Sequence, residues 1–432
     1  MISAEIFLVM AALPQKSLPL ENHASSPSWR GRIKESPWTW LAGITLLSVA
    51  LVMAGQAVMP KGKMFPDYIT YWTAGKLVAS GQSPYDVDRQ IEIQRTLGWD
   101  RSINGRGVLD FLPYYYPPWF ALGCTLLVPL GFEGGKIAWF FLNLEMLFFS
   151  CFVLRDAVPG VPRSIALVAV PLCLFSVEAL LAGQTTILIL FLAALAWKLL
   201  DGHRDRAAGV ALACLTTKPQ LAAVLVLALG IWGVRQRRWS VFHGFAATLA
   251  LLCLASSVVV PSWPMEMLSA TRRTLPPTEY FPWLGNTWYL ILRTLGLRSW
   301  SLWVLFLAVA LPFLWAVVRT AINPARPLRD VIALGLLAAF FVAPYGRDYD
   351  FPVLWIPAFV LIGERLSEKA GAALLLGLIV IPYLQFILLV RYSRLIVPEV
   401  DFYIECTYFW VPALLATLWF VTDSRQRPSA TE

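Results

Sequence analysis

The chain has 432 residues, of which 58% are hydrophobic and only 14% are charged, and its formal net charge is +8. A soluble domain carries about 25% charged residues, so this composition excludes a predominantly soluble protein. Stretches of about 20 apolar residues recur along the chain and predict an all-α, polytopic membrane protein. No basic, aromatic soluble module is present that would predict nucleic-acid binding.

Cysteine and histidine usage argues against a structural metal or a disulfide framework. The six cysteines lie in or at the ends of apolar segments without CxxC spacing, and the three histidines are isolated. This pattern predicts small apolar core cysteines and no histidine-based metal site.

The N-terminal 37 residues begin with a short apolar stretch, and residues 14–37 are rich in Ser and Pro and end with Arg30, Arg32 and Lys34. They predict a disordered basic segment, and the positive-inside rule places it in the cytoplasm. The first membrane span is then expected at Trp38–Val58, followed by a long outer loop, 59–112.

Two short interfacial helices are expected in the outer loop. Tyr68–Ala79 has helical spacing with aromatic residues on one side, which is typical of a helix lying on the membrane surface. The Ser80–Pro84 stretch breaks it, and a second short helix is expected over Asp88–Thr96.

The next apolar stretch, Tyr114–Leu130, is short and flanked by prolines. We interpret it as a re-entrant or interfacial segment, because this choice places nearly every short basic loop inside. Further spans are expected at Lys136–Leu154, Ile165–Leu181, Thr186–Leu200, Val241–Val260, Leu302–Val318, Val331–Ala343, Val353–Gly363, Ala370–Val390 and Cys406–Val421. The sequence thus predicts a single domain, 38–421, with about 10 to 12 transmembrane helices, and a cytoplasmic tail, 422–432.

Ala207–Val234 has basic loops at both ends and Lys218-Pro219 in its middle. Proline removes a helix donor and disfavours helical backbone at the residue before it. A broken hairpin with Lys218 at its turn is expected, with one kinked span as the alternative.

Polar segments on the expected outer side supply the candidate site, and Asp67 is the first of them. An aspartate before a helix is often only an N-cap. The functional alternative is a general base that takes a proton from an acceptor hydroxyl.

Lys218 is the second candidate. A cation at bilayer depth costs roughly 2.5–3.5 kcal/mol unless it has a partner. That partner is either a substrate phosphate or an internal group such as Glu178, Glu145 or a backbone carbonyl.

The third candidate is the turn Tyr345–Asp350. Arg347 suits phosphate binding, and Asp348 or Asp350 would orient it or hold a divalent cation. The alternative is a surface turn with a local Arg–Asp pair.

Three further polar or aromatic stretches have both a functional and a structural interpretation. The run Tyr114–Trp119 is either an interfacial aromatic belt or a surface for sugar stacking. Gly183-Gln184 and Gly285-Asn286 are turns that either hydrogen-bond a sugar or serve only as turns.

Several of these pieces, taken in order, resemble glycosyltransferase family 87. The pieces are Asp67-Tyr-Ile-Thr-Tyr-Trp-Thr-Ala-Gly, Gly81-Gln-Ser-Pro-Tyr-Asp86, Tyr116-Pro-Pro with Pro129-Leu, Gly183-Gln184, Lys218-Pro-Gln220, Arg237-Arg-Trp239, Gly285-Asn286 and Tyr349-Asp350. The resemblance implies a GT-C fold and an inverting transfer of a hexose, commonly mannose, from a polyprenyl-phosphate donor. The acceptor is expected to be a lipid or glycan at the outer face of the plasma (inner) membrane.

By the same resemblance Asp67 is the catalytic base. The expected substrate-binding residues are Tyr68, Tyr71, Trp72, Tyr116, Gln184, Lys218, Asn286, Arg347 and Asp350. The family often has a histidine where this chain has Tyr345. A sugar or lipid transporter (flippase) and a non-catalytic subunit of an envelope assembly are the alternative functions.

Overall fold

The computed structural model describes residues 67–99, 111–157, 161, 163–279, 284–396 and 405–425, together with the single residues 43, 45, 46 and 50. Two compact units are distinguished, Met1–Val58 and Met59–Glu432. The four described residues of the first unit are helical. The expectations for the N-terminal segment, most of the first span, and 426–432 lie outside the described residues.

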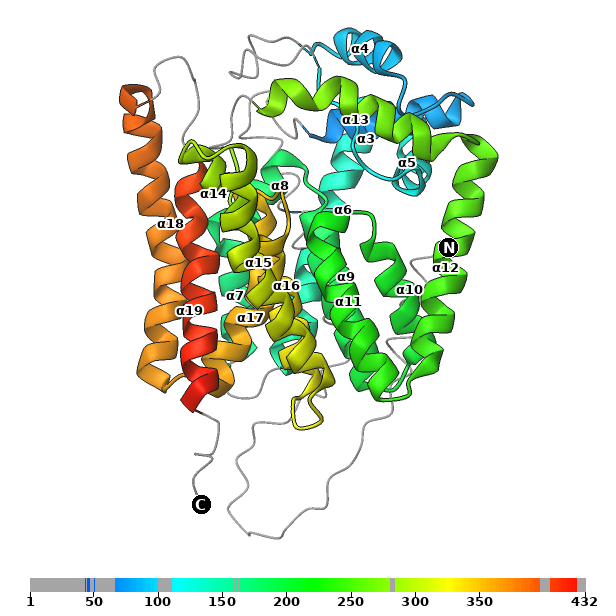
Figure 1. Cartoon of the computed structure of the whole chain (residues 1–432). Helices are drawn as coiled ribbons and strands as arrows, with labels where there is room; N and C mark the ends of the chain where they lie inside the picture. Colours follow the sequence, from blue (N-terminus) through cyan, green and yellow to red (C-terminus); the bar gives the residue numbers. More distant parts are fainter. Residues whose placement is uncertain are drawn as a thin grey trace. The chain divides into compact units, whose positions relative to one another are not determined.

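In the second unit every regular element of the described residues is a helix (Figure 1). The N-terminal elements are α3 (Tyr68–Ala79), α4 (Val87–Thr96), α5 (Pro118–Cys124), η1 (Thr125–Leu130), α6 (Gly131–Ala157), α7 (Arg163–Leu172), α8 (Leu174–Ala182), α9 (Thr186–Asp201), α10 (Asp205–Leu215) and α11 (Pro219–Arg235). The remaining elements are α12 (Trp239–Val259), α13 (Trp263–Glu279), α14 (Trp288–Thr294), α15 (Ser299–Ile322), α16 (Leu328–Val342), η2 (Asp348–Leu354), α17 (Trp355–Val360), η3 (Leu361–Arg365), α18 (Glu368–Ile396), η4 (Glu405–Phe409) and α19 (Trp410–Arg425).

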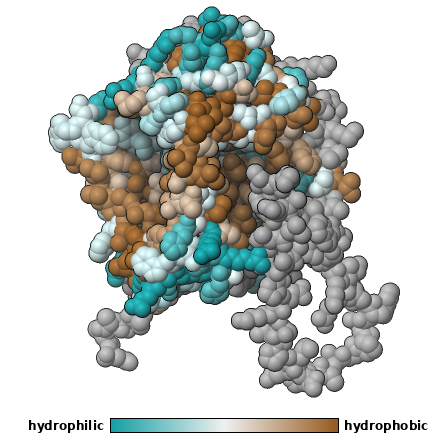
Figure 2. Space-filling view, turned by 90° about the vertical axis from the view of Figure 1, so that its right-hand side faces the viewer, coloured by the Kyte–Doolittle hydropathy of each residue, from teal (hydrophilic) through white to brown (hydrophobic). Residues whose placement is uncertain are grey.

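Several helices are long and apolar enough to cross a membrane. Four candidate spans occur among the described residues, namely Pro118–Leu154, α12, α15 and Glu368–Tyr392. Helices α8 and α9 are bent by 118° relative to each other, and they would make a fifth span if the pair is counted as one. Apolar side chains form a band between two hydrophilic ends of the surface (Figure 2). The chain is therefore a membrane protein, and the 10 to 12 crossings expected from the sequence stay a prediction.

Helix α3 has the bounds expected from the sequence, and it is buried in the protein. Ten of its twelve residues are buried, and its rings pack into one apolar cluster with Phe120, Trp139 and Tyr114. Tyr68, Tyr71 and Trp72 share one face of the helix, and this face packs on protein side chains. Helices α5, η1 and α6 cover α3, and its position at the membrane surface stays a prediction.

The proline-flanked stretch Tyr114–Leu130 forms the short helices α5 and η1, and both pack against α3. A side chain at Gly75 would lie 2.8 Å from the backbone of Cys124, so α3 and α5 meet backbone to backbone. Gly131, with φ of 69°, then starts α6. Neither short helix is long enough to cross a bilayer alone.

The segment around Lys218 is a broken hairpin, as expected. Helix α10 ends at Leu215 and α11 begins at Pro219. Arg238, before α12, donates to the Leu200 carbonyl at 2.8 Å and to the Asp205 carboxylate at 2.9 Å. The start of α10 and the end of α11 therefore lie at the same end of the bundle, and Lys218 lies at the turn between them.

One expected single span is interrupted, and another changes helix type along its length. Ile165–Leu181 divides into α7 and α8, because Cys173 is extended (φ −64°, ψ 137°) just after Pro171. Val353–Gly363 consists of the end of η2, α17 and part of η3. Hydropathy alone indicated neither the break at Cys173 nor the change of helix type after Leu354.

Glycine allows α10 and α12 to pack closely. A Cβ at Gly209 would lie 2.6 Å from the Phe245 nitrogen, and one at Gly244 would lie 2.9 Å from the Arg206 carbonyl carbon. Small residues at such positions let helix backbones approach in membranes.

Replacing Gly244 with valine is expected to destabilise the protein by about 1–3 kcal/mol, because overpacking forces the two helices apart. Thermal unfolding of the purified protein in detergent checks this. Gly377→Ala is the control, since its Cβ would meet only Ile381 at 3.6 Å. Equal melting temperatures for the two variants would contradict the close packing.

Candidate functional site

Asp67 begins α3, but its side chain does not cap the helix. It makes no side-chain cap hydrogen bond, and its carboxylate instead accepts a hydrogen bond from Gln184 Nε2. Its backbone N–H donates to the Ala182 carbonyl at 3.1 Å. The start of α3 is thus fixed to the end of α8, and the N-cap alternative is not the role of this carboxylate.

Gln184 lies in the sharp bend between α8 and α9. Gly183 has φ of 74°, a left-handed conformation that suits glycine, and its carbonyl accepts from Trp139 Nε1 at 2.8 Å. The buried amide of Gln184 donates to Asp67 and accepts from Lys218 Nζ at 3.4 Å. One amide therefore connects the carboxylate of Asp67 to the cation of Lys218.

Lys218 pairs with Asp350, a candidate residue whose pairing with Lys218 the sequence did not indicate. Its ammonium contacts Asp350 Oδ1 and donates to Thr186 Oγ1 at 2.9 Å. Thr186 also donates to Asp350 Oδ1, at 2.6 Å. The side chains of Lys218 and Asp350 are 2% and 0% exposed. The buried cation therefore has the Asp350 carboxylate as its counter-charge. The expected pairing with Glu178, Glu145 or a carbonyl is replaced by this pair.

Arg347 is held by Glu405, a residue that the sequence did not indicate. The guanidinium donates through Nε at 2.6 Å and through Nη2 to the two carboxylate oxygens. Asp350 accepts from the Arg347 backbone N–H at 3.0 Å instead of from its side chain. The bidentate contact leaves Nη1 without a protein partner among the described residues.

Tyr349 lies between the two cations. Lys218 Nζ is 5.1 Å and the Arg347 guanidinium carbon 4.9 Å from the centre of its ring. Both distances suit cation–π attraction. The ring thereby connects the Lys218–Asp350 pair to the Arg347–Glu405 pair.

Two phenols line the Asp67 side of this network. The hydroxyls of Tyr71 and Tyr116 are 3.1 Å apart, and Thr185 Oγ1 is 3.5 Å from that of Tyr116. Burial raises the pKa of both phenols above the ordinary value of 10. They therefore remain neutral donors near pH 7.

Not every expected binding residue lies in this network. Tyr68 and Trp72 belong to the apolar cluster around α3, where Tyr68 packs on Phe132 and Trp139. Asn286 is fully buried beside the turn, and its backbone N–H donates to the Gly346 carbonyl at 2.7 Å. Its amide has no hydrogen-bond partner among the described residues.

No group of three or more histidine, cysteine, aspartate or glutamate side chains in the described part of the chain is placed to hold a metal ion. Asp350, one of the two expected ligands for a divalent cation, contacts Lys218, Thr186 and the Arg347 backbone instead. Its carboxylate is thus occupied by protein donors.

Four members of the network share one structural origin, because each lies where a helix starts or breaks. Asp67 precedes α3, Gln184 separates α8 from α9, Lys218 separates α10 from α11, and Asp350 lies in η2. Irregular backbone at membrane depth is tolerated where protein or a polar cavity satisfies it. The arrangement presents one partly exposed carboxylate, Asp67, in front of a charge-balanced buried cluster.

The comparisons with known proteins match one family. The model of glycosyltransferase family 87 matches residues 114–344, which include Tyr116, Gln184, Lys218 and Asn286. Searches among curated proteins and solved structures found no match.

Proposed function

Because the chain belongs to glycosyltransferase family 87 and is therefore a glycosyltransferase, we propose that it transfers a hexose, mannose in the first instance, from a polyprenyl-phosphate donor to a lipid or glycan acceptor. In this proposal the fold is a GT-C-like bundle of 10 to 12 transmembrane helices. The site faces the outer side of the membrane, and both termini are cytoplasmic.

The observation that carries the proposal is the binding of Asp67 to Gln184. A carboxylate at a helix start normally caps that helix, whereas this one is directed to the bend between α8 and α9. Gln184 occupies Oδ2, and no hydrogen bond from a described residue reaches Oδ1. A general base needs such an oxygen within hydrogen-bonding reach of the acceptor hydroxyl.

The proposed reaction is a single displacement. Asp67 takes the proton of the acceptor hydroxyl while the acceptor oxygen forms a bond to the anomeric carbon. The bond from that carbon to the phosphate oxygen breaks, and the polyprenyl phosphate leaves with the electron pair. The anomeric configuration is inverted, and the phosphate needs no protonation to depart.

Arg347 is the group proposed to bind the leaving phosphate. Its guanidinium is fixed by Glu405 and retains Nη1 for a phosphate oxygen, and guanidinium–phosphate bonds are among the strong charge-assisted ones. Lys218 already has Asp350 as its counter-ion. We assign it mainly to orienting Gln184, with Tyr71, Tyr116 and Asn286 available to sugar hydroxyls.

A direct assay tests the function. The purified full chain in lipid is incubated with radiolabelled polyprenyl-phosphate-mannose and a lipid extract from its host. A labelled lipid of inverted anomeric configuration is expected. If mannose, glucose and arabinose donors all give no product while labelled lipid crosses sealed vesicles, the transporter alternative replaces the proposal.

Gln184→Leu is expected to lower kcat by about 10–10²-fold with little change in KM, because the base loses the group that positions it. Kinetics on the purified variant measure this. The matched control is Gln90→Leu, since the buried amide of Gln90 also bonds twice, to Pro84 and Tyr114, but does not contact Asp67. If Gln90→Leu lowered kcat as much as Gln184→Leu, the proposal that Gln184 positions the base would be contradicted.

A further inference from the structure

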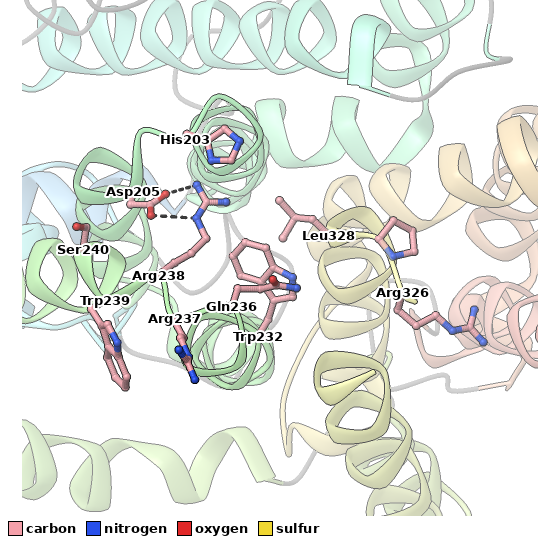
Figure 3. Close-up of a pocket in the computed structure, with 11 residues that line it drawn as sticks. His203, Asp205, Trp232, Gln236, Arg237, Arg238, Trp239, Ser240, Arg326 and Leu328 are labelled. Carbon is pink, nitrogen blue, oxygen red and sulfur yellow. Dashed lines mark hydrogen bonds and ion pairs between the residues drawn. The ribbon is translucent and has the colours of Figure 1, made fainter. Parts of the chain in front are cut away.

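A polar pocket lies at the other end of the bundle from Asp67. It has a volume of about 720 Å³ and lies where α9 ends and α10, α12 and α16 begin (Figure 3). Helix α9 connects the two regions, from Thr186 beside Lys218 to Asp201. At 1.5 Å per residue its length separates them by roughly 24 Å. The candidate site therefore does not include this pocket.

Two of the three arginines in the pocket are neutralised by protein carboxylates. Arg238 bonds Asp205 and the Leu200 carbonyl, as the dashed lines of Figure 3 show for Asp205. Arg326 pairs with Asp330 and Asp423, and in Figure 3 it extends away from Trp232 and Gln236.

Arg237 is different. It is exposed and forms no ion pair with any described residue. Its backbone has φ of 55°, a left-handed conformation that costs energy for a residue other than glycine. The chain thus keeps an unpaired arginine at a strained position on the pocket wall.

The backbone adds to the positive potential. Helices α10, α12 and α16 all begin at the pocket, and none of their N-caps makes a side-chain cap hydrogen bond. Helix N-termini carry partial positive charge and unpaired N–H groups. Asp205 and Asp330 lie in the first turns of α10 and α16. The N-terminus of α12 has no acidic residue in its first turn, and together with Arg237 it makes the pocket suited to an anion.

The surroundings indicate an anion that carries acyl chains. Trp232 forms a buried wall of the pocket, and Trp239 is 53% exposed at the first turn of α12. Farther along α12, Leu251, Leu254 and Val258 are also exposed. Tryptophan favours the membrane interface, and an exposed apolar helix beside it suits lipid chains.

We propose that this pocket binds the phosphate of an anionic phospholipid, with Arg237 as its main contact and Trp239 against the glycerol region. Basic pockets between membrane helices bind such head groups in other proteins. The proposal is independent of the proposed transfer reaction. It also gives a use to the Arg237-Arg-Trp239 motif, which the Asp67 site leaves unused.

The test is native mass spectrometry of the full chain from phosphatidylcholine nanodiscs with and without phosphatidylglycerol. The wild type is expected to retain one phosphatidylglycerol. Arg237→Gly should weaken retention about tenfold or more, because charge-assisted bonds to phosphate are lost. Glycine suits the left-handed backbone at this position, so this variant keeps its fold, and Arg237→Lys should restore most binding.

Arg206→Ala is the matched control, because Arg206 is exposed at the same end but does not line the pocket. Equal loss of retention in this variant would overturn the proposal, since general surface charge would explain it. Inorganic phosphate is tested alone by thermal shift. Stabilisation by phosphate with no retained phosphatidylglycerol would assign the pocket to a free anion and overturn the lipid proposal.

Discussion

Asp67→Asn is expected to lower kcat by about 10²–10⁴-fold and to leave the melting temperature unchanged. General-base catalysis contributes a factor of this size. Asparagine keeps an oxygen that can accept from Gln184 Nε2, so the contact between α3 and the α8–α9 bend survives. Single-turnover transfer of labelled sugar, together with thermal unfolding, measures both effects.

Asp86→Asn is the matched control for this change. Asp86 precedes α4 and caps it, because its side chain accepts from the Arg89 backbone N–H at 3.1 Å. Asparagine is an equally good N-cap, so both activity and stability should be retained. If the Asp67→Asn variant transferred sugar at the same rate as the Asp86→Asn variant, Asp67 would not be the general base.

Lys218→Met is expected to destabilise the protein by about 3–5 kcal/mol, because it leaves the fully buried Asp350 without a counter-charge. Asp350→Leu alone should cost a similar amount. The double variant should recover much of the loss, since replacing a whole buried pair by apolar residues is often neutral. A double-mutant cycle from chemical unfolding measures the coupling.

The exposed pair Arg273–Asp88 serves as the control for this cycle. Its side chains are 57% and 74% exposed, and the Arg273 hydrogen bond holds the pKa of Asp88 below its ordinary value. Water and salt screen such pairs, so Asp88→Ala should not measurably change stability. Additive losses in the Lys218 and Asp350 variants would show that the buried pair is not coupled.

Local signals in the sequence sufficed where structure is locally determined. The bounds of α3 followed from its helical spacing and the break at Ser80–Pro84, and the turn at Lys218 followed from Pro219. The long apolar helices α12 and α15 were placed within a few residues. Each of these features depends on side chains close together in the chain.

Pairings between distant segments could not be obtained in this way. Lys218 and Asp350 are 132 residues apart, and Arg347 and Glu405 are 58 apart. From the sequence alone, any carboxylate near a predicted outer helix end is an equally good partner for Lys218 or Arg347. The tertiary packing determines which carboxylate is in contact. The same holds for α3, whose aromatic residues fit a membrane interface or a buried core equally well.

The origin of the site from four separated helix breaks has a consequence for synthesis. Asp350 leaves the ribosome roughly 280 residues after Asp67, which at about 5–20 residues per second is tens of seconds. During the last 132 residues of that interval Gln184 and Lys218 are already made, and Lys218 lacks its counter-ion. In that state the nascent chain carries a cation that costs roughly 2.5–3.5 kcal/mol at bilayer depth without a partner, and pairing requires synthesis to reach Asp350.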